Sequence, residues 1–380
     1  MNARPLAGSW KPWAMFRRER AFATPSPARV VRSSDLWGVV MGRQRPGAPT
    51  LEEVAALAGV GRGTVSRVIN DAAGVKDSTR RAVQRAIEEL GYVPNLAARS
   101  LAGRRADAVA LVMTEPDWRQ FGEPFFSEIV QSVGDALTDT KVQLLLTLVR
   151  TDAERQRLVE YARGGRVDGV MLMSVHAGDA LPDMLAEVGL PTVLLGRRSG
   201  DESVTYVDAD NVGGARSAVA HLLNRGRRAV ATITGPLDMY VAQCRLRGYR
   251  EALERAGVEG RRSWVAEGDF SQDSGHRAMA ELLERSPEID AVFAASDTMA
   301  AAALHTLRAA GRRVPEDVAV IGFDDFPLAR RTDPQLTTVR QPLEEIGRTM
   351  VRLLLEEMED SAVAWRHVIL RTELVLRDSA

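Results

Sequence analysis

Short, almost wholly apolar segments alternate with amphipathic segments throughout the chain beyond about residue 105. Apolar strands spaced by helices predict parallel sheets that are covered on both faces. The roughly 275 residues of this region suit two doubly wound sheets better than one. Seven segments are predicted as strands: AVALVM (108–113), VQLLLTLV (142–149), DGVMLM (168–173), PTVLLG (191–196), AVATIT (229–234), AVFAAS (291–296) and VAVIGF (318–323).

Residues 50–94 carry a different pattern, which predicts three short amphipathic helices. Thr50-x-x-Glu53 has the spacing of a capping box, in which each side chain bonds a free backbone N–H at a helix start. Three short helices with a tight turn between the first two are typical of a helix-turn-helix. The expected helices end at Gly59, run from about Arg62 to Ile69, and run from about 78 to 90 before Gly91; their inward residues are Val54, Ala55 and Leu57, then Val65, Val68 and Ile69, then Val83, Ile87 and Leu90.

The glycines of GVGRGTVSRVIN (59–70) raise a second interpretation, a loop that cradles a nucleotide phosphate. A dinucleotide fingerprint needs G-x-G-x-x-G after a strand, and a P-loop needs G-K-[ST]. Here the spacing is G-x-G-x-G, the preceding segment EEVAALA is helical in pattern, and no lysine follows. The helix-turn-helix is therefore favoured, with Gly59 supplying a left-handed turn and Gly61 capping the second helix.

Two further segments flank these helices. Residues 1–49 contain several prolines, show no clear period and lack the pattern of a secretory signal. They are either a disordered basic arm or an over-long translated start with Met41 as the true first residue, and we favour the second. After Pro94, the stretch LAARSLAGRR (96–105) predicts a short helical segment that ends at Gly103.

Composition limits the classes of protein to which the chain can belong. It has 380 residues, 45% of them hydrophobic, and no apolar run long enough to span a membrane. Cys244 is the only cysteine, so no internal disulfide can form, which favours the reducing cytoplasm. Residues 1–105 hold 18 basic and 8 acidic side chains, whereas residues 106–380 hold 32 and 43. We therefore expect only the front of the chain to meet a polyanion.

Several motifs together resemble those of one known family. TVSRVIN (64–70), GYVPN (91–95) and SLAGRR (100–105) stand in the order and spacing of the DNA-binding head of the lac-repressor (LacI) family, and VDADNVGGARSAVAHLLNRGRR (207–228), CRLRGYREAL (244–253) and DVAVIGFDDFPLARRTDPQLTTVRQP (317–342) resemble its effector-binding core. The resemblance spans residues 50–380. It implies an α/β fold in which a helix-turn-helix head and a hinge helix precede a two-lobed, doubly wound core like that of periplasmic binding proteins.

The resemblance also implies a domain layout. An extension (1–49) is followed by the DNA-binding head (50–94), by the hinge helix and linker (95–105), and by a core for effector binding and dimerisation (106–380). Within the core, the first lobe is expected to hold about 106–210 and 340–369, and the second about 211–339 and 370–380.

By position in the family, the candidate DNA contacts lie on and around the second helix. Arg62, Gly63 and Arg67 occupy positions that read base edges, where an arginine can form a bidentate pair with guanine. Gly63 has no side chain, so this reading position is silent. The remaining head contacts, which are expected to fix register on the phosphates rather than to specify sequence, are Thr64, Ser66 and Asn70, with Thr50 as a further DNA contact.

Residues 95–103 match the family's hinge helix, which lies in the minor groove when two subunits dock. By position, Leu101 is expected to wedge between central base pairs and kink the duplex, with Asn95, Ala98 and Arg99 beside it. The alternative is that Leu101 is simply a core residue. The polar Ala-Gly-Arg-Arg that follows it disfavours that alternative.

Two polar residues are the main candidate effector contacts. By position in the family, Arg245 and Asp324 bond ligand hydroxyls in a cleft between the lobes, and Ser296 is a weaker candidate. Asp324-Asp325 and Asp208/Asp210 also raise the alternative of a glycosidase carboxylate pair. Adjacent residues at a strand end diverge, however, and no Ser or His constellation accompanies them, so ligand binding is favoured over catalysis.

Aromatic residues near the expected cleft are candidates for stacking on a sugar ring. They are Phe125, Trp118 and Tyr240. Phe125 and Phe126 are adjacent and cannot both face one way, so one of them is expected in the core. The five histidines show no ligand spacing, so we expect no metal site, and the sequence indicates no cofactor.

These features predict a DNA-binding transcriptional regulator, and we expect a repressor, although activation stays open. Two heads that bind two half-sites of a pseudo-palindromic operator imply a homodimer, and no heptads follow the last strand to build a tetramer. An effector that closes the cleft would change the angle between the lobes, disturb the hinge helices and lower operator affinity. Such a coupling is by linkage reciprocal.

The identity of the effector is a separate question. The segments TEPDWRQFGEPFFSEI (114–129), SVHAGD (174–179) and CRLRGYREAL (244–253) resemble regulators of cello-oligosaccharide use, which favours a β-glucoside such as cellobiose. A purine or nucleoside effector is the alternative, as is a sugar-binding protein without a regulatory role. Such a protein would lack residues 50–105, and an enzyme would need an acid/base set that the chain does not supply.

Overall fold

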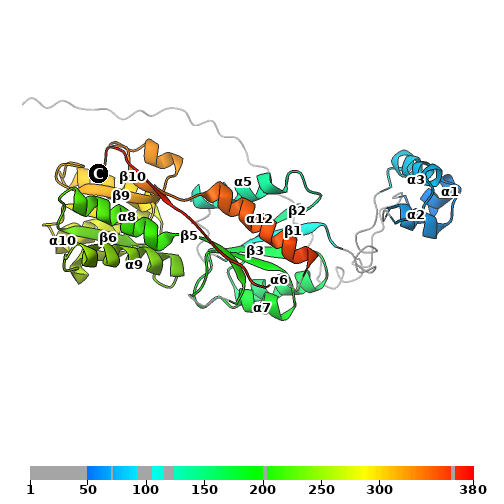
Figure 1. Ribbon diagram of the computed structural model, residues 1–380, viewed down its shortest axis with the longest axis horizontal. Coiled ribbons are helices and arrows are strands. Elements are labelled where there is room, and N and C mark those ends of the chain that lie inside the picture. Colours follow the sequence, from blue (N-terminus) through cyan, green and yellow to red (C-terminus); the bar gives the residue numbers. More distant parts are fainter. Residues whose placement is uncertain (1–48, 70–71, 93–104, 115–123, 200–202, 361–363) are drawn as a thin grey trace, which may run out of the picture. The chain divides into compact units, whose positions relative to one another are not determined.

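The structure, a computed structural model, describes residues 49–69, 72–92, 105–114, 124–199, 203–360 and 364–380 (Figure 1). The chain divides between Pro94 and Asn95 into two compact units, called here the head and the core. No helix within these described stretches is long and apolar enough to cross a membrane.

The head consists of three helices, α1 (Leu51–Leu57), α2 (Arg62–Ile69) and α3 (Asp77–Leu90), as the sequence predicts. The capping box at Thr50 is confirmed, since the Glu53 amide donates to the threonine hydroxyl and the Glu53 carboxylate accepts from the Thr50 amide. Leu57 differs from the expectation because it is 47% exposed. The inner face of α1 follows i, i+3, i+4 spacing through Leu51, Val54, Ala55 and Ala58, which leaves Leu57 outside the stripe.

The turn between α1 and α2 uses the two glycines as predicted. Gly59 has φ +65, the left-handed region that glycine enters without a steric penalty. The Gly61 carbonyl accepts from the amides of Thr64 at 2.8 Å and Val65 at 3.2 Å, so Gly61 stands at the N-cap position of α2.

Gly59→Ala is expected to destabilise the head by about 1–2 kcal/mol, the cost of a left-handed conformation for a residue with a Cβ. No heavy atom lies within 4 Å of a Cβ built at Gly59, so no steric clash adds to this cost. Gly63→Ala is the matched control: it also meets open space but lies inside α2, where alanine stabilises by up to about 1 kcal/mol. Hydrogen exchange of the α2 amides measures both, and equal effects would contradict the role given to Gly59.

The core contains two six-stranded sheets, which define two lobes. The first lobe has the strand order β11-β5-β4-β3-β1-β2 with every neighbour parallel, and the second has β12-β10-β9-β8-β6-β7, in which only the β10–β12 pair is antiparallel. The strands are β1 (Ala108–Met113), β2 (Gln143–Leu148), β3 (Gly169–Met173), β4 (Thr192–Leu195), β5 (Thr205–Ala209), β6 (Val230–Thr234), β7 (Val265–Glu267), β8 (Ala291–Ala294), β9 (Ala319–Asp324), β10 (Thr337–Arg340), β11 (His367–Leu370) and β12 (Glu373–Val375).

Helices cover both faces of each sheet, which gives every lobe three layers (Figure 1). In the first lobe, α5 (Pro124–Leu137) and α12 (Leu343–Glu359) pack on one face, and α6 (Asp152–Arg163) and α7 (Leu181–Glu187) on the other. In the second lobe, the same arrangement is made by α8 (Asn211–Asn224) with α9 (Tyr240–Arg255), and by α10 (Gln272–Arg285) with α11 (Asp297–Ala309).

The chain passes between the lobes three times. It crosses from β5 to α8 at 209–211, from β10 to α12 at 340–343, and from β11 to β12 at 370–373. β10 ends at Arg340 and β11 ends at Leu370, directly before the second and third crossings. Because each crossing follows the carboxyl end of a strand, all three lie near the edge where the sites of doubly wound sheets form.

Candidate functional site

A cavity of about 110 Å³ lies between the two lobes, many times the space that one ordered water needs. Its lining comes from the carboxyl ends of strands in both sheets, where ligands of open α/β sheets bind. The lining combines four phenylalanines with a group of polar side chains: Phe125, Phe126, Phe270 and Phe326 with Arg197, Asp208, Asn211, Arg245, Ser296, Asp324 and Gln341.

The structure brings together most of the predicted effector contacts. Arg245 of α9, Asp324 of β9, Phe125 of α5 and Ser296, the N-cap residue of α11, all line the cavity. Phe126 lines it as well and is also part of the first lobe's core, as expected for one member of the adjacent pair. The predicted Trp118 lies outside the described residues.

Arg245 is held rigidly inside this cavity. The side chain is 5% exposed, its Nε donates to Asn211 Oδ1 at 2.9 Å, and an NH1 proton goes to the Ala295 carbonyl. The guanidinium carbon lies 3.8 Å from the centre of the Phe323 ring, and NH1 lies 3.7 Å from Asp324 Oδ1. Burial lowers the pKa of Arg245, and the neighbouring Asp324 carboxylate opposes that shift. The result is a preoriented donor group that lies beside a carboxylate on the wall of the cavity.

Asp324 and Asp325 point to different partners, so they do not form a catalytic carboxylate pair. Asp324 ends β9 with φ +120, and its Oδ1 accepts from Gln341 Nε2 at 2.7 Å. Asp325, with φ +62, is bonded by Arg340 Nε at 2.7 Å and by Arg377. Positive φ values at two consecutive non-glycine residues indicate a strained turn, a feature that clusters at binding sites.

A buried carboxyl group beneath this turn helps to fix its shape. Asp297 Oδ2 accepts from the Phe326 amide at 2.9 Å, and its Oδ1 accepts from the Thr338 hydroxyl at 2.5 Å. Burial and the nearby Asp324 carboxylate raise the pKa of Asp297 well above its ordinary value. The preceding Ser296 caps α11 by accepting from the Met299 amide at 3.2 Å.

Sequence reasoning missed a polar chain that links the lobes through a crossing. Arg197 Nε donates to Asp208 Oδ2 at 3.1 Å, and Asp208 Oδ1 accepts from Asn211 Nδ2 at 2.8 Å. Asn211 in turn accepts from Arg245, so hydrogen bonds run from the first lobe, across residues 209–211, to the second. Burial raises the pKa of Asp208, and the Arg197 guanidinium opposes that shift. The available signal in the sequence was the short spacing between Asp208 and Asn211, which stand at the border between β5 and α8.

Tyr240 is placed differently from the sequence expectation. It is the first residue of α9 and is not among the cavity-lining residues. Its ring faces the Arg197 guanidinium, with 5.0 Å between the guanidinium carbon and the ring centre. Because Asp208 holds Arg197 in place, the guanidinium is available as a flat cation for the ring to cover.

The candidate DNA contacts in the head lie mainly on the start of α2. Arg62, Gly63 and Arg67 are exposed, whereas Thr64 and Ser66 are half-buried. The Arg62 side chain is 72% exposed and pairs with Glu52 of α1 at 2.9 Å. The predicted contacts that lie outside the described residues are Asn70, Asn95, Ala98, Arg99 and Leu101.

Two protein families match segments of this sequence. Residues 50–95 match the family described as bacterial regulatory proteins, lacI family, and residues 219–380 match a periplasmic binding protein-like domain. The chain is 53% identical over 338 residues to the HTH-type transcriptional regulator CelR of Thermobifida fusca, across 88% of this chain and 99% of CelR. It is 36% identical over 313 residues to the HTH-type transcriptional repressor PurR of Erwinia tasmaniensis, across 81% of this chain and 90% of PurR.

Solved structures of similar proteins include complexes with small molecules. One is the complex of the transcriptional regulator CelR with cellobiose, with a TM-score of 0.70 and 52% identity over 87% of this chain and 100% of that one. Another is the lac repressor dimer bound to operator and the anti-inducer ONPF, with a TM-score of 0.77 and 28% identity over 87% of this chain and 99% of that one.

Proposed function

The chain belongs to the lacI family of bacterial transcriptional regulators, and on that premise we propose that it is a homodimeric, operator-binding repressor which cellobiose releases. The cytoplasm is the compartment in which such a protein meets its DNA. The observation that carries the choice of effector is the cavity between the lobes, which combines preoriented polar groups with four phenylalanine rings. The cellobiose complex of the similar CelR supports this choice.

The chemistry of the cavity suits a short sugar. Sugar hydroxyls both donate and accept, so they can bond the Arg245 guanidinium and the Asp324 carboxylate at once. The apolar faces of pyranose rings pack on aromatic rings, and Phe125 and Phe270 come from opposite lobes. A ligand that bridges these groups binds best when the lobes are close together.

Effector binding is transmitted through the crossings between the lobes. A sugar that bonds Arg245 acts on Asn211 and so on the crossing at 209–211, because Asn211 accepts from Arg245 and donates to Asp208. In the sequence the hinge segment directly precedes the first lobe, whose Ala106 amide donates to Asp168 Oδ1 at 2.6 Å. A change in the angle between the lobes therefore alters the geometry from which two hinge segments leave the dimer, and operator affinity falls in proportion to the differential affinity for the effector.

Cellobiose is expected to release the full-length protein from the palindrome in the promoter beside its gene. Fluorescence anisotropy of the labelled operator at fixed salt measures the release, and isothermal titration measures sugar affinity. Glucose, cellotriose and a purine base form the comparison panel. The purine is included because the chain is 36% identical to a repressor named PurR. Tighter binding of the purine or of glucose than of cellobiose would sink the proposed effector, and failure to protect any palindrome at low salt would sink the proposed regulator.

A further inference from the structure

A loop of the second lobe touches the first lobe at the rim of the cavity. Asp238, between β6 and α9, places Oδ2 2.7 Å from His176 Nδ1 in the loop that follows β3 of the first lobe. The Ala177 amide donates to the Asp238 carbonyl at 2.9 Å. Two residues further on, the Tyr240 ring covers Arg197 of the first lobe. Three contacts of different kinds therefore join the lobes within one short stretch of chain.

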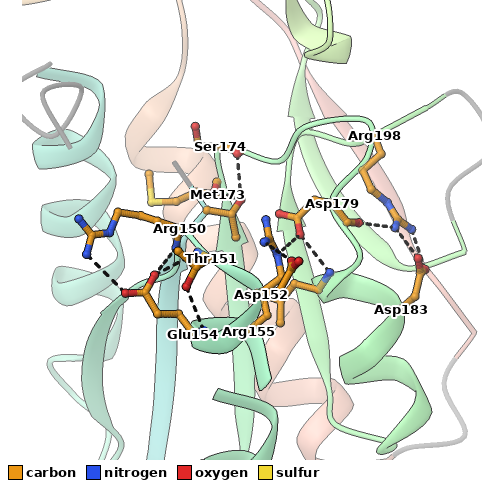
Figure 2. Close-up of polar contacts among 12 residues, drawn as sticks. Arg150, Thr151, Asp152, Glu154, Arg155, Met173, Ser174, Asp179, Asp183 and Arg198 are labelled. Atoms are coloured by element: carbon orange, nitrogen blue, oxygen red, sulfur yellow. Dashed lines mark hydrogen bonds and ion pairs between the residues drawn. The ribbon is translucent and has the colours of Figure 1, made fainter. Parts of the chain in front are cut away.

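The first-lobe side of these contacts is firmly anchored (Figure 2). Asp179, whose side chain is 1% exposed, accepts from Arg155 Nε of α6 at 3.0 Å. Its carbonyl accepts from Arg198 NH1 at 2.9 Å, and Arg198 forms a bidentate pair with Asp183 of α7. The loop at 174–180 is thus tied to two helices and to the segment after β4, so it presents His176 and Ala177 in a fixed position.

The same two loops also form part of the cavity wall. Ser174 and Val175 line the cavity from the first lobe, and Met239 lines it from the second. The contacting residues His176, Asp238 and Tyr240 stand next to these lining residues in the sequence but do not line the cavity themselves. Their contacts depend on the separation of the lobes without depending on direct contact with a ligand.

We propose that His176, Arg197, Asp238 and Tyr240 form a clasp between the lobes that holds the cavity closed around its ligand and so slows ligand release. This inference rests on the proposed effector function. It makes His176, Asp238 and Tyr240 positioning residues, which raise effector affinity by stabilising the closed arrangement. The Nδ1–H tautomer of His176 donates to the carboxylate whether or not the ring is protonated.

Removing one contact is expected to have a modest effect, because the side chains of Asp238 and His176 are 62% and 21% exposed. Exposed charged contacts are weak, so Asp238→Ala or His176→Ala should weaken cellobiose binding about two- to fivefold. The double variant should be no weaker than the worse single variant, since both changes delete one contact. The loss should lie in the dissociation rate, as measured by stopped-flow fluorescence on the full chain.

Conservative variants and a matched control separate the clasp from a merely structural role. His176→Asn keeps a donor near the Nδ1 position and Tyr240→Phe keeps a ring, so both should retain near wild-type affinity. Asp333→Asn is the control: its side chain is 91% exposed and pairs with Arg308 at 3.0 Å, but within one lobe. Asp238→Asn should weaken cellobiose binding and Asp333→Asn should not; equal effects from the two would overturn the clasp.

A second measurement needs no ligand. In the triple variant His176→Ala, Asp238→Ala, Tyr240→Ala, amide exchange of residues 174–180 should rise at least about threefold, because the Ala177 amide loses its partner when the lobes separate. Exchange in β3 should not change. If wild-type protein does not bind cellobiose, the proposed effector is wrong and the exchange result alone decides the clasp. Unchanged exchange at 174–180 would refute the clasp whatever the effector is.

Discussion

Replacing Arg245 with methionine is expected to abolish the response to cellobiose while operator binding persists, giving a repressor that cannot be induced. The buried guanidinium bonds Asn211 and the Ala295 carbonyl and faces Asp324, so its loss removes the main cationic donor of the cavity. A hydrogen bond from a charged group contributes about 1.5–3 kcal/mol, which corresponds to a loss of cellobiose affinity of about 10- to 100-fold for each bond that the ligand makes to the guanidinium. Isothermal titration of the full chain with cellobiose measures the loss, and operator anisotropy shows that the head still works.

A matched control lies two residues further along the same helix. Arg247 is 56% exposed and has only a loose pair with Glu251 at 3.8 Å. Arg247→Met should therefore leave cellobiose affinity within about twofold of wild type, as surface changes usually do. If Arg245→Met binds cellobiose with wild-type affinity, the site assigned to cellobiose is wrong. If circular dichroism and thermal unfolding show that Arg245→Met does not fold, Asp324→Asn takes its place as the test. A normal response of Asp324→Asn to cellobiose would then show that the assigned site is wrong.

Arg62→Ala is expected to weaken operator binding strongly, and this is the second of the two largest effects that we predict. A bidentate arginine–guanine pair discriminates by about 1–3 kcal/mol, and a symmetric dimer loses two such pairs, which makes about 2–6 kcal/mol per operator. In the protein without DNA, the Arg62 side chain is 72% exposed and pairs with Glu52. Because exposed ion pairs contribute little to stability, the arginine can exchange this pair for guanine at little cost in free energy. Quantitative footprints at fixed salt measure the change in affinity.

The specificity of that loss distinguishes base reading from phosphate contact. Arg62→Ala and Arg67→Ala should each relax the preference at one base pair per half-site, which a set of operators with single substitutions reveals. Arg85→Ala, on α3, is the control because its Nε donates to the Arg81 carbonyl and it stands outside α2. A uniform loss across all operators for Arg62→Ala would assign Arg62 to the phosphates instead.

The apolar pattern predicted seven strands of the core, and the structure contains all seven. Six of them are buried along their whole length, as a nearly continuous apolar run implies. The seventh, β2, is an edge strand in which Leu146 and Leu148 are 59% and 49% exposed. Its run of leucines predicts burial on both faces of the sheet, and the structure shows that one face is exposed.

The strands that the pattern missed are short or polar. β10 reads TTVR and β12 reads ELV, and neither offers a long apolar run. β5 reads TYVDA and carries Asp208 near its carboxyl end, where the chain crosses between the lobes. Such strands are stabilised by neighbours far away in the sequence, which no local pattern records.

The candidate site was predictable only as far as the family motif reaches. Arg245 and Asp324 were found by position in the family, and both line the cavity. Asn211 escaped notice because its importance arises from hydrogen bonds to Asp208 and to Arg245, a partner 34 positions away. Tyr240 is predicted to contact the effector because exposed aromatics often bind ligands, and the structure adds a contact that the sequence does not indicate, between its ring and the Arg197 guanidinium.

The three passages of the chain between the lobes also bear on how the protein is made. β11, near the end of the sequence, completes the first lobe's sheet, and β12 follows it at once in the second. The hydroxyl of the buried Ser379 accepts a hydrogen bond from the Thr337 amide at 2.8 Å and donates one to the Val320 carbonyl. Neither sheet is complete before β11 and β12 have been synthesised. The two lobes therefore become complete almost together, instead of folding one after the other as separate domains do.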